Sequence, residues 1–344
     1  MRILIARLGA YGDTLITTPL IRYLKQQGHE IYYLTSDNGR TILENNPNVD
    51  KLIFHERDSV PNTKLGEYFE ATKKLYECDQ LIDLCESIEI NLAFSPSQPQ
   101  SKYPKFEKMA IANRNYYEET FEFTARQVGD YGRLVMGWKD HNLNPEMFFT
   151  EQEEKFIEED IRIPYMGKKK ILWGLSGSSR QKTYPPEYMV KVIQAFPDYI
   201  HITVGEEVCR LLEWPFSHVS VKDQFPNVVT RAAKFTMRES ILACKYVDLV
   251  IAPDTGLLHG SGCFDTPKIG LLTNTSRENI TKHFKNDYSL EAENVACAPC
   301  FNLIYDANVQ AQTDEEDVPL CMKWGHPPER LIKRIKEVFD DQNT

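Results

Sequence analysis

The chain has 344 residues, 42% of them hydrophobic, and a formal net charge of −10 at pH 7. This length exceeds what one ordinary hydrophobic core organises, so we expect two domains. No run of residues approaches the roughly 20 apolar positions of a membrane-spanning helix, which predicts a soluble protein without a transmembrane segment. The acidic balance argues against nonspecific binding of nucleic acid, because such binding relies on basic surface.

The cysteines and the start of the chain indicate where in the cell the protein is located. Of the eight cysteines, Cys78, Cys85, Cys209, Cys244 and Cys263 show no pairing rhythm and are interpreted as core residues. Unpaired cysteines are typical of a reducing environment, so we expect a cytoplasmic protein. No signal peptide precedes the short apolar strand that opens the chain, which favours the same location.

The first half of the chain alternates predicted strands and helices. Strands are expected at residues 2–6, 30–34, 51–54 and 80–84, and helices at 13–27, 39–44 and 64–76. This β-α-β-α order predicts a parallel sheet with right-handed crossovers. Residues 86–109 are interpreted as a long loop and 113–128 as an aromatic-rich helix.

A second α/β series follows a boundary placed near residues 163–168. Strands are expected at 170–175, 199–204, 247–252 and 267–272, and helices at 151–160, 185–195, 236–244 and 327–339. We therefore expect an N-terminal Rossmann-like acceptor domain at 1–165, a C-terminal Rossmann-like donor domain at 166–325, and a terminal helix at 326–344 that packs back on the first domain. The two parallel sheets are expected to face a central cleft.

The stretch from Val247 to His259 points most directly to a ligand. Its apolar residues predict a buried strand, and Asp254-Thr255-Gly256 supplies a turn and a helix cap. A helix that begins there directs unpaired N–H groups and the positive end of its dipole out of the carboxyl edge of a sheet. The segment therefore predicts a site for a phosphorylated small molecule.

A second loop with the same placement follows the first predicted strand. The sequence Gly9-Ala10-Tyr11-Gly12-Asp13 joins that strand to a helix, which places Asp13 where open α/β sheets bind their ligands. The alternative interpretation is that Asp13 is only a helix cap.

These motifs resemble those of glycosyltransferase family 9, the ADP-heptose:lipopolysaccharide heptosyltransferases and their relatives. The resemblance rests on four ordered segments: Gly12-Asp13 with Thr18-Pro19; Ser176-Gly177-Ser178-Ser179 with Lys182-Thr183-Tyr184-Pro185; Val204-Gly205-Glu206; and Asp254 to His259. It implies a GT-B fold and an inverting transfer of a heptose or related sugar from a nucleotide-diphosphate sugar. It also implies that catalysis requires no metal or other cofactor.

The resemblance assigns a role to each matching residue. Asp13 resembles the family's general base, and Lys182 resembles the lysine that neutralises the donor diphosphate. Glu206 resembles the acid that binds the nucleoside ribose, and Asp254 the aspartate near the sugar and phosphate. The remaining expected donor contacts are Ser178, Ser179, Thr255, Gly256 and His259. Each of these residues also has a purely structural alternative, as a cap, a surface charge or a packed helix residue.

The sequence departs from the family pattern at several positions. Tyr184 stands where a Trp is usual, and Thr273-Asn274-Thr275-Ser276 replaces the usual Phe-Gly-Pro-Thr loop that touches the donor. The donor is therefore expected to be of ADP or UDP type without a narrower assignment. Gly12, Lys102 and Arg114 are the candidate acceptor contacts, and the alternative for the two basic residues is a solvated charged loop.

The acceptor interpretations are a glycan of lipopolysaccharide type, a protein or a modified nucleobase. Two alternatives come from other classes. One is a non-catalytic nucleotide-sugar binding protein, and Asp13 favours an enzyme over it. The other is a sugar-nucleotide epimerase or phosphatase on a similar two-domain scaffold, which would need a second acid or histidine base in the cleft. A lipopolysaccharide acceptor would add peripheral association with the inner membrane.

Three further cysteines form a separate motif. Cys297 and Cys300 have the Cys-x-x-Cys spacing of a metal knuckle or redox pair, and Cys321 follows. His326 is the nearest candidate for a fourth ligand. A structural zinc or iron site, unpaired thiols and a disulfide are the three interpretations.

Overall fold

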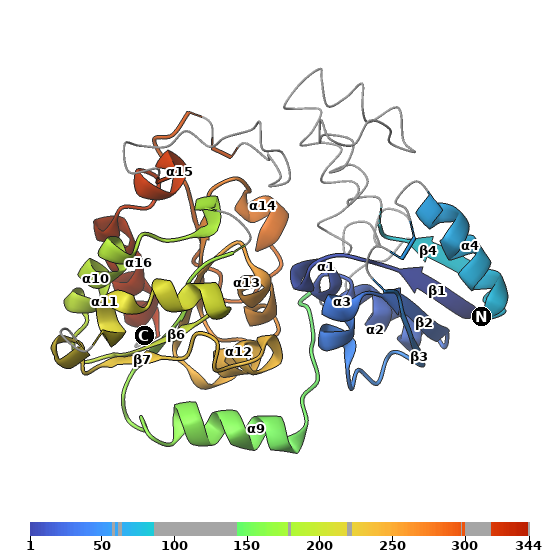
Figure 1. The fold of residues 1–344 in the computed structure, drawn as a ribbon, viewed down its shortest axis with the longest axis horizontal. Coiled ribbons are helices and arrows are strands. Elements are labelled where there is room, and N and C mark those ends of the chain that lie inside the picture. The colour runs from blue at the N-terminus through green and yellow to red at the C-terminus, as the bar shows by residue number, and fades with distance from the viewer. Residues whose placement is uncertain are drawn as a thin grey trace. The chain divides into compact units, whose positions relative to one another are not determined.

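The computed structural model describes residues 1–56, 59–60, 64–85, 143–177, 180–218, 222–296, 298–299 and 318–342. Over this part of the chain there are two compact units, which divide between Phe148 and Phe149. Each unit is built around a parallel β-sheet with helices packed on it (Figure 1). The predicted α/β class with two parallel sheets is thus confirmed.

Unit 1 contains a four-stranded sheet in the order β3-β2-β1-β4. Its strands are β1 (Arg2–Ala6), β2 (Glu30–Thr35), β3 (Lys51–Phe54) and β4 (Gln80–Asp83). Its helices are α1 (Tyr11–Leu15), α2 (Thr18–Gln26), α3 (Asp37–Leu43) and α4 (Leu65–Leu75). All adjacent strands are parallel. The chain runs outward from β1 to β3 and returns to the other side of β1, so the strand order reverses between β1 and β4.

The single helix expected over residues 13–27 is two helices, α1 and α2. Pro19 stands in the first turn of α2, and proline has no N–H to continue a helical ladder from α1. The hydroxyls of Thr17 and Thr18 donate to the carbonyl oxygens of Thr14 (2.7 Å) and Leu15 (2.8 Å) at the break. These bonds satisfy carbonyls that a continuous helix would have satisfied with its backbone.

Unit 2 contains a six-stranded parallel sheet in the order β10-β9-β8-β5-β6-β7. Its strands are β5 (Lys170–Gly174), β6 (Ile200–Val204), β7 (Val228–Thr230), β8 (Leu249–Pro253), β9 (Lys268–Leu272) and β10 (Leu290–Glu291). Its helices are α9 (Glu151–Ile157), α10 (Pro186–Ala195), α11 (Trp214–Ser217), α12 (Met237–Ala243), α13 (Gly256–Ser261), α14 (Arg277–Ile280), α15 (Leu320–Lys323) and α16 (Pro328–Asp341).

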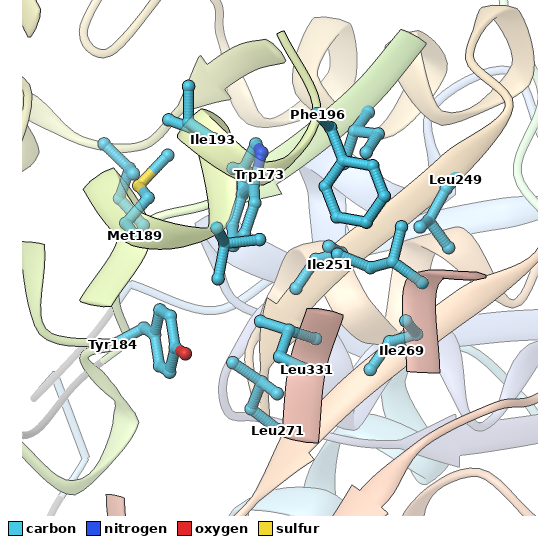
Figure 2. Packing of buried hydrophobic residues seen from close by; sticks show 14 of the residues in the cluster. Trp173, Tyr184, Met189, Ile193, Phe196, Leu249, Ile251, Ile269, Leu271 and Leu331 are labelled. Carbon is cyan, nitrogen blue, oxygen red and sulfur yellow. The ribbon is translucent and has the colours of Figure 1, made fainter. Parts of the chain in front are cut away.

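The core of unit 2 lies between one face of this sheet and the helices α10 and α16. Figure 2 shows Trp173 on β5 and Ile251 on β8 packed with Leu331 of α16 and with Tyr184. Every residue of β5, β8 and β9 is buried. Central strands of a parallel sheet are covered on both faces, which is why their sequences are nearly continuous apolar runs.

The C-terminal helix α16, expected as a separate terminal element, is part of unit 2. Leu331, Ile335 and Val338 are fully buried in the core of unit 2. Their spacing places them on one stripe of the helix, and this stripe lies against the unit 2 core beside α10 (Figure 1).

The boundary between the units falls earlier than the expected residue 165, because α9 and the turn after it are held to unit 2. Glu153 accepts two hydrogen bonds from the guanidinium of Arg238 (2.5 and 3.1 Å). Asp160 accepts two from Arg231 (2.7 and 3.1 Å). Bidentate pairs of this kind fix both the distance and the orientation of the partners, so this helix is part of the second unit.

Candidate functional site

Both sheets reverse their strand order once, and charged side chains gather at each reversal. In unit 2 the chain proceeds from β5 to β6 and β7 on one side, and then to β8, β9 and β10 on the other. The reversal therefore lies between β5 and β8, as it lies between β1 and β4 in unit 1. In open α/β sheets, ligands bind outside the carboxyl ends of the strands at such points.

A buried ion pair joins the two strand ends at the reversal in unit 2. Lys182 ends a short 3-10 turn after β5, and Asp254 directly follows β8. The Lys182 Nζ atom lies 3.0 Å from Oδ2 of Asp254, and the two side chains are only 10% and 6% exposed. Charged groups leave water at a high cost unless they are paired. The pair therefore fixes the loop after β5 to the loop after β8.

Two more side chains contact the Asp254 carboxylate. Nε2 of His259 lies 3.3 Å from Oδ1, and Oγ1 of Thr275 lies 3.5 Å from Oδ2. His259 is on α13, and its other ring nitrogen, Nδ1, is buried without a hydrogen-bond partner among the described residues. A buried polar atom without a partner is unfavourable, and a bound ligand could satisfy it.

Gly177 allows the loop after β5 to approach this cluster closely. A Cβ at Gly177 would lie 2.9 Å from both Cβ of Lys182 and Cγ2 of Thr255. The Gly177 N–H donates to the carbonyl oxygen of Lys182 (2.9 Å). Thr255 caps α13 through its side chain, which accepts from the N–H of Leu258, and Gly256 is the first residue of that helix. Four of the predicted donor residues, Lys182, Asp254, Thr255 and His259, are thus in one cluster.

Glu206, the predicted ribose-binding acid, lies on the same carboxyl edge of the unit 2 sheet. It follows β6, is exposed, and precedes a 3-10 turn at Glu207–Leu211. Its neighbour Gly205 packs closely on Cys209, because a Cβ there would lie 2.6 Å from the cysteine sulfur. Of the predicted donor and acceptor residues, Ser178, Ser179, Lys102 and Arg114 lie outside the described part of the chain, as do the expected loop at 86–109 and helix at 113–128.

The reversal in unit 1 carries Asp13, in the first turn of α1. Oδ1 of Asp13 lies 2.9 Å from Nη2 of Arg7, and Oδ2 accepts a hydrogen bond from the backbone N–H of Ala10 (2.9 Å). The Asp13 side chain is 37% exposed, whereas Arg7 is 2% exposed. Gly9 has a φ of +140°, and a Cβ there would lie 2.5 Å from Oδ2 of Asp13. The candidate acceptor residue Gly12 is buried within α1.

Sequence reasoning missed two members of these clusters, Arg7 and Thr275. The signal for Arg7 was a lone cation immediately after the apolar residues of β1 and six positions before Asp13. The signal for Thr275 was the departure of its loop from the family pattern, since the new hydroxyl groups bring hydrogen-bonding capacity to a buried position. Thr275 is 1% exposed.

The cysteine motif is only partly within the described structure. Cys297 and Cys300 lie outside it, and Cys321 is buried in α15. His326 is fully buried, with Nε2 2.9 Å from the carbonyl oxygen of Leu272 and Nδ1 without a hydrogen-bond partner among the described residues. No group of three or more His, Cys, Asp or Glu side chains arranged to hold a metal occurs within that part of the chain.

Known proteins resemble this chain over its whole length. Lipopolysaccharide heptosyltransferase 1 of Campylobacter coli is 24% identical over 99% of this chain and all of its own. The solved glycosyl transferase family 9 protein of Veillonella parvula has a TM-score of 0.68 at 16% identity, covering 99% of this chain and 97% of its own. The E. coli ADP-heptose LPS heptosyltransferase II has a TM-score of 0.64 at 11% identity, covering both chains fully. These likenesses confirm the GT-B fold.

A more distant neighbour is the iron-containing dodecameric glycosyltransferase TibC of E. coli, with a TM-score of 0.57 at 9% identity over 99% of this chain and 77% of its own. The family model for glycosyltransferase family 9 (heptosyltransferase) matches residues 127–304, which is more than half of the chain. With the motifs and the fold in agreement, the chain belongs to glycosyltransferase family 9 and is a glycosyltransferase.

Proposed function

We propose that this enzyme transfers a heptose from ADP-heptose to a hydroxyl of a lipopolysaccharide-type glycan, with inversion at the anomeric carbon. The donor is proposed from relatives, since solved E. coli proteins of this fold include a heptosyltransferase with ADP and with an ADP-heptose analogue. The acceptor is proposed from the name of the Campylobacter relative. The observation that carries the proposal is the buried Lys182–Asp254 pair at the strand reversal of unit 2.

Lys182 is suited to stabilise the leaving diphosphate. Its ammonium has three donors, of which one is directed at Asp254. The remaining donors are proposed to bind the donor phosphates. The leaving ADP gains negative charge as the bond to the sugar breaks, so a fixed cation stabilises the transition state more than the ground state.

The other residues of the cluster are proposed to orient the donor. Asp254 and His259 would contact the sugar and the adjacent phosphate, and the backbone N–H groups of Thr255 and Gly256 would bind phosphate oxygens. Glu206 would accept hydrogen bonds from the ribose hydroxyls, for which its exposed position after β6 is suited.

Asp13 is proposed as the general base. The acceptor oxygen forms a bond to the anomeric carbon, the bond from that carbon to the diphosphate oxygen breaks, and the acceptor proton passes to the Asp13 carboxylate. One displacement of this kind inverts the anomeric centre. The exposed fraction of Asp13 leaves its carboxylate accessible to a substrate hydroxyl.

Calorimetry with ADP tests the donor half of this proposal. We expect Lys182→Ala to weaken ADP binding about 10- to 100-fold, the value of a lost charge-assisted hydrogen bond. Lys170→Ala is the matched control, because Lys170 is also buried in unit 2 and also faces an aspartate, Asp248, but stands at the opposite end of β5. Equal ADP affinity in wild type and Lys182→Ala would contradict the assigned role.

A transfer assay tests the acceptor half. The wild type is mixed with ADP-heptose and one of three acceptors: lipopolysaccharide from a heptose-less strain, an unglycosylated protein extract, or free nucleosides. We expect heptose on the lipopolysaccharide. Transfer to protein or nucleosides would overturn the acceptor assignment, and ADP binding without any transfer would favour a non-catalytic binding protein.

We further propose a cytoplasmic enzyme that associates peripherally with the inner membrane, where such an acceptor is held. No helix in the described ranges has the length and hydrophobicity needed to cross a bilayer. Separation of cell lysate into cytosol and washed membranes tests this. Release of the membrane-bound fraction by salt without detergent is expected, and a requirement for detergent would contradict it.

We also propose that Cys297, Cys300, Cys321 and His326 hold a structural zinc or iron ion. Nε2 of His326 faces a carbonyl oxygen and so carries the proton, which leaves a buried lone pair on Nδ1. This is the tautomer of a metal-ligating histidine, whose other nitrogen donates to a carbonyl. TibC is described as iron-containing. Metal analysis of the purified protein should find about one ion per chain, and Cys321→Ser should lower that content; an equal, negligible content in both proteins would contradict the site.

A further inference from the structure

We propose that Arg7 is a positioning residue that holds the Asp13 carboxylate in the orientation and the ionised state that base catalysis needs. This inference rests on the proposed function of Asp13. It adds to that function a second residue, which does not itself contact substrate and acts only through Asp13.

Arg7 is held from both neighbouring strands at the carboxyl end of β1. Its backbone N–H donates to the carbonyl oxygen of Leu34 in β2 (3.0 Å), and its carbonyl oxygen accepts from the hydroxyl of Thr35 at the end of the same strand (2.9 Å). Its side chain turns toward β4, where Nη1 donates to the carbonyl oxygen of Leu84 (2.5 Å). The guanidinium therefore connects the end of β1 to the residue that follows β4. Its other terminal nitrogen, Nη2, contacts the Asp13 carboxylate.

The Asp13 carboxylate is fixed on both oxygens. Arg7 contacts Oδ1, and the N–H of Ala10 donates to Oδ2. Gly9 provides the space for Oδ2, since any side chain there would overlap it. A carboxylate oxygen can accept more than one hydrogen bond. The two contacts hold the group in one orientation, and the substrate proton is proposed to pass to one of these oxygens.

The charge of Arg7 matters as well as its geometry. A base must be ionised to accept a proton, and an adjacent cation favours the ionised carboxylate. Arginine remains charged at every working pH. Arg7 is 2% exposed and Asp13 is 37% exposed, so water screens this interaction only in part.

The fork of arginine is required to reach both partners. Its two terminal nitrogens point in fixed, diverging directions, so one can bind Leu84 while the other binds Asp13. A lysine ammonium is a single point on a flexible chain. We therefore expect Arg7→Lys to keep part of the electrostatic effect and lose most of the orientation.

The test compares wild type with Arg7→Met and Arg7→Lys in the transfer assay with ADP-heptose and heptose-less lipopolysaccharide. The matched control is Arg2→Met. Arg2 stands at the other end of β1 and has the same kinds of partner, a carboxylate on Glu30 (3.0 Å) and the carbonyl oxygen of Tyr76 (3.0 Å). Urea unfolding of each variant, followed by circular dichroism, checks that unit 1 is folded, and ADP calorimetry checks that unit 2 is intact.

We expect Arg7→Met to lower kcat roughly 10- to 100-fold with an unchanged KM for ADP-heptose, as for a displaced catalytic group. The acid limb of its pH–rate profile should move to higher pH by about one unit. Arg7→Lys should lower kcat with a smaller displacement of that limb, and Arg2→Met should leave both unchanged. In an Asp13→Asn background, Arg7→Met should cause no further loss, because Arg7 acts only through Asp13.

A readout without turnover separates this inference from the proposed function. NMR of protein labelled with ¹³C at the aspartate carboxyl groups follows the titration of Asp13 directly. The Asp13 signal is identified by its absence from the spectrum of Asp13→Asn, and its titration midpoint is measured in wild type and in Arg7→Met. A higher titration midpoint in Arg7→Met supports the inference even if no transfer is found, which would count against the proposed function alone. An unchanged midpoint, or a kcat and pH profile equal to wild type, would overturn it. If Arg7→Met does not fold, Arg7→Lys decides by the same measurements.

Discussion

His201 makes the stability of unit 2 sensitive to acid. It is fully buried on β6, where Nδ1 accepts a hydrogen bond from Nε1 of Trp173 (3.1 Å) and Nε2 faces the carbonyl oxygen of Phe196 (3.2 Å). The neutral ring satisfies both contacts, whereas a proton on Nδ1 would oppose the indole N–H. Burial lowers the pKa of His201 from 6.5 to about 4.

The size and the pH range of the effect follow from these pKa values. The folded-state pKa lies below that of the unfolded chain, so the contribution is complete above pH 6.5 and is lost as the pH falls toward 4. The decrease of the His201 pKa from 6.5 to about 4 corresponds to about 3 kcal/mol of unfolding free energy, which is lost completely only below the lower value. About 1 kcal/mol of it is lost by about pH 5.5.

The perturbation is His201→Gln, which cannot be protonated, and the assay is urea unfolding followed by tryptophan fluorescence. We expect the variant to be less stable than wild type at neutral pH, because it loses packing. The difference should shrink by roughly 2–3 kcal/mol between about pH 7.5 and pH 4.5. His29→Gln, in unit 1, is the control. A difference between wild type and His201→Gln that stays constant with pH would show that protonation of His201 does not destabilise unit 2.

Three further predictions concern Tyr184, the Lys182–Asp254 pair and Gly9. Tyr184→Phe should raise the free energy of unfolding by about 1 kcal/mol, because the Tyr184 hydroxyl, visible in Figure 2, is buried without a hydrogen-bond partner among the described residues; a lower melting temperature would contradict this. Asp254→Asn should cost about 3–5 kcal/mol in chemical denaturation, because it leaves the Lys182 ammonium buried without a counter-charge; a loss below 1 kcal/mol would argue against a tight pair. Gly9→Ala should reduce transfer activity at least about tenfold while ADP binding is retained, since its Cβ would displace Asp13; wild-type activity would contradict the close approach.

The strands could be predicted because local sequence determines them strongly. Runs such as Leu249–Pro253 are apolar at every position, which is the pattern of a strand covered on both faces. Two helix starts were equally clear, because Thr150 and Thr236 each form a capping box with a glutamate three residues later. The strands β7 and β10 were missed because three and two residues carry no measurable periodicity.

Placement in three dimensions was harder to predict than the elements themselves. The amphipathic stripe of α16 indicates that the helix packs on something, but it does not say which sheet. The contacts that complete the two clusters also join distant residues: Arg7 meets Leu84, and Thr275 meets Asp254. Such partners are chosen by the order of strands in the sheet, which local patterns do not encode.

Mass spectrometry of heptose-less lipopolysaccharide, after incubation with ADP-heptose and either wild type or Asp13→Asn, shows whether heptose is transferred and whether Asp13 is the base. We expect a gain of one heptose mass with wild type and a rate about 10²- to 10⁴-fold lower with Asp13→Asn, the usual contribution of a general base. ADP affinity should be equal in the two proteins. Heptose transfer by Asp13→Asn at the wild-type rate would contradict the assignment of the base, and no transfer by folded, ADP-binding wild type would contradict the proposed reaction.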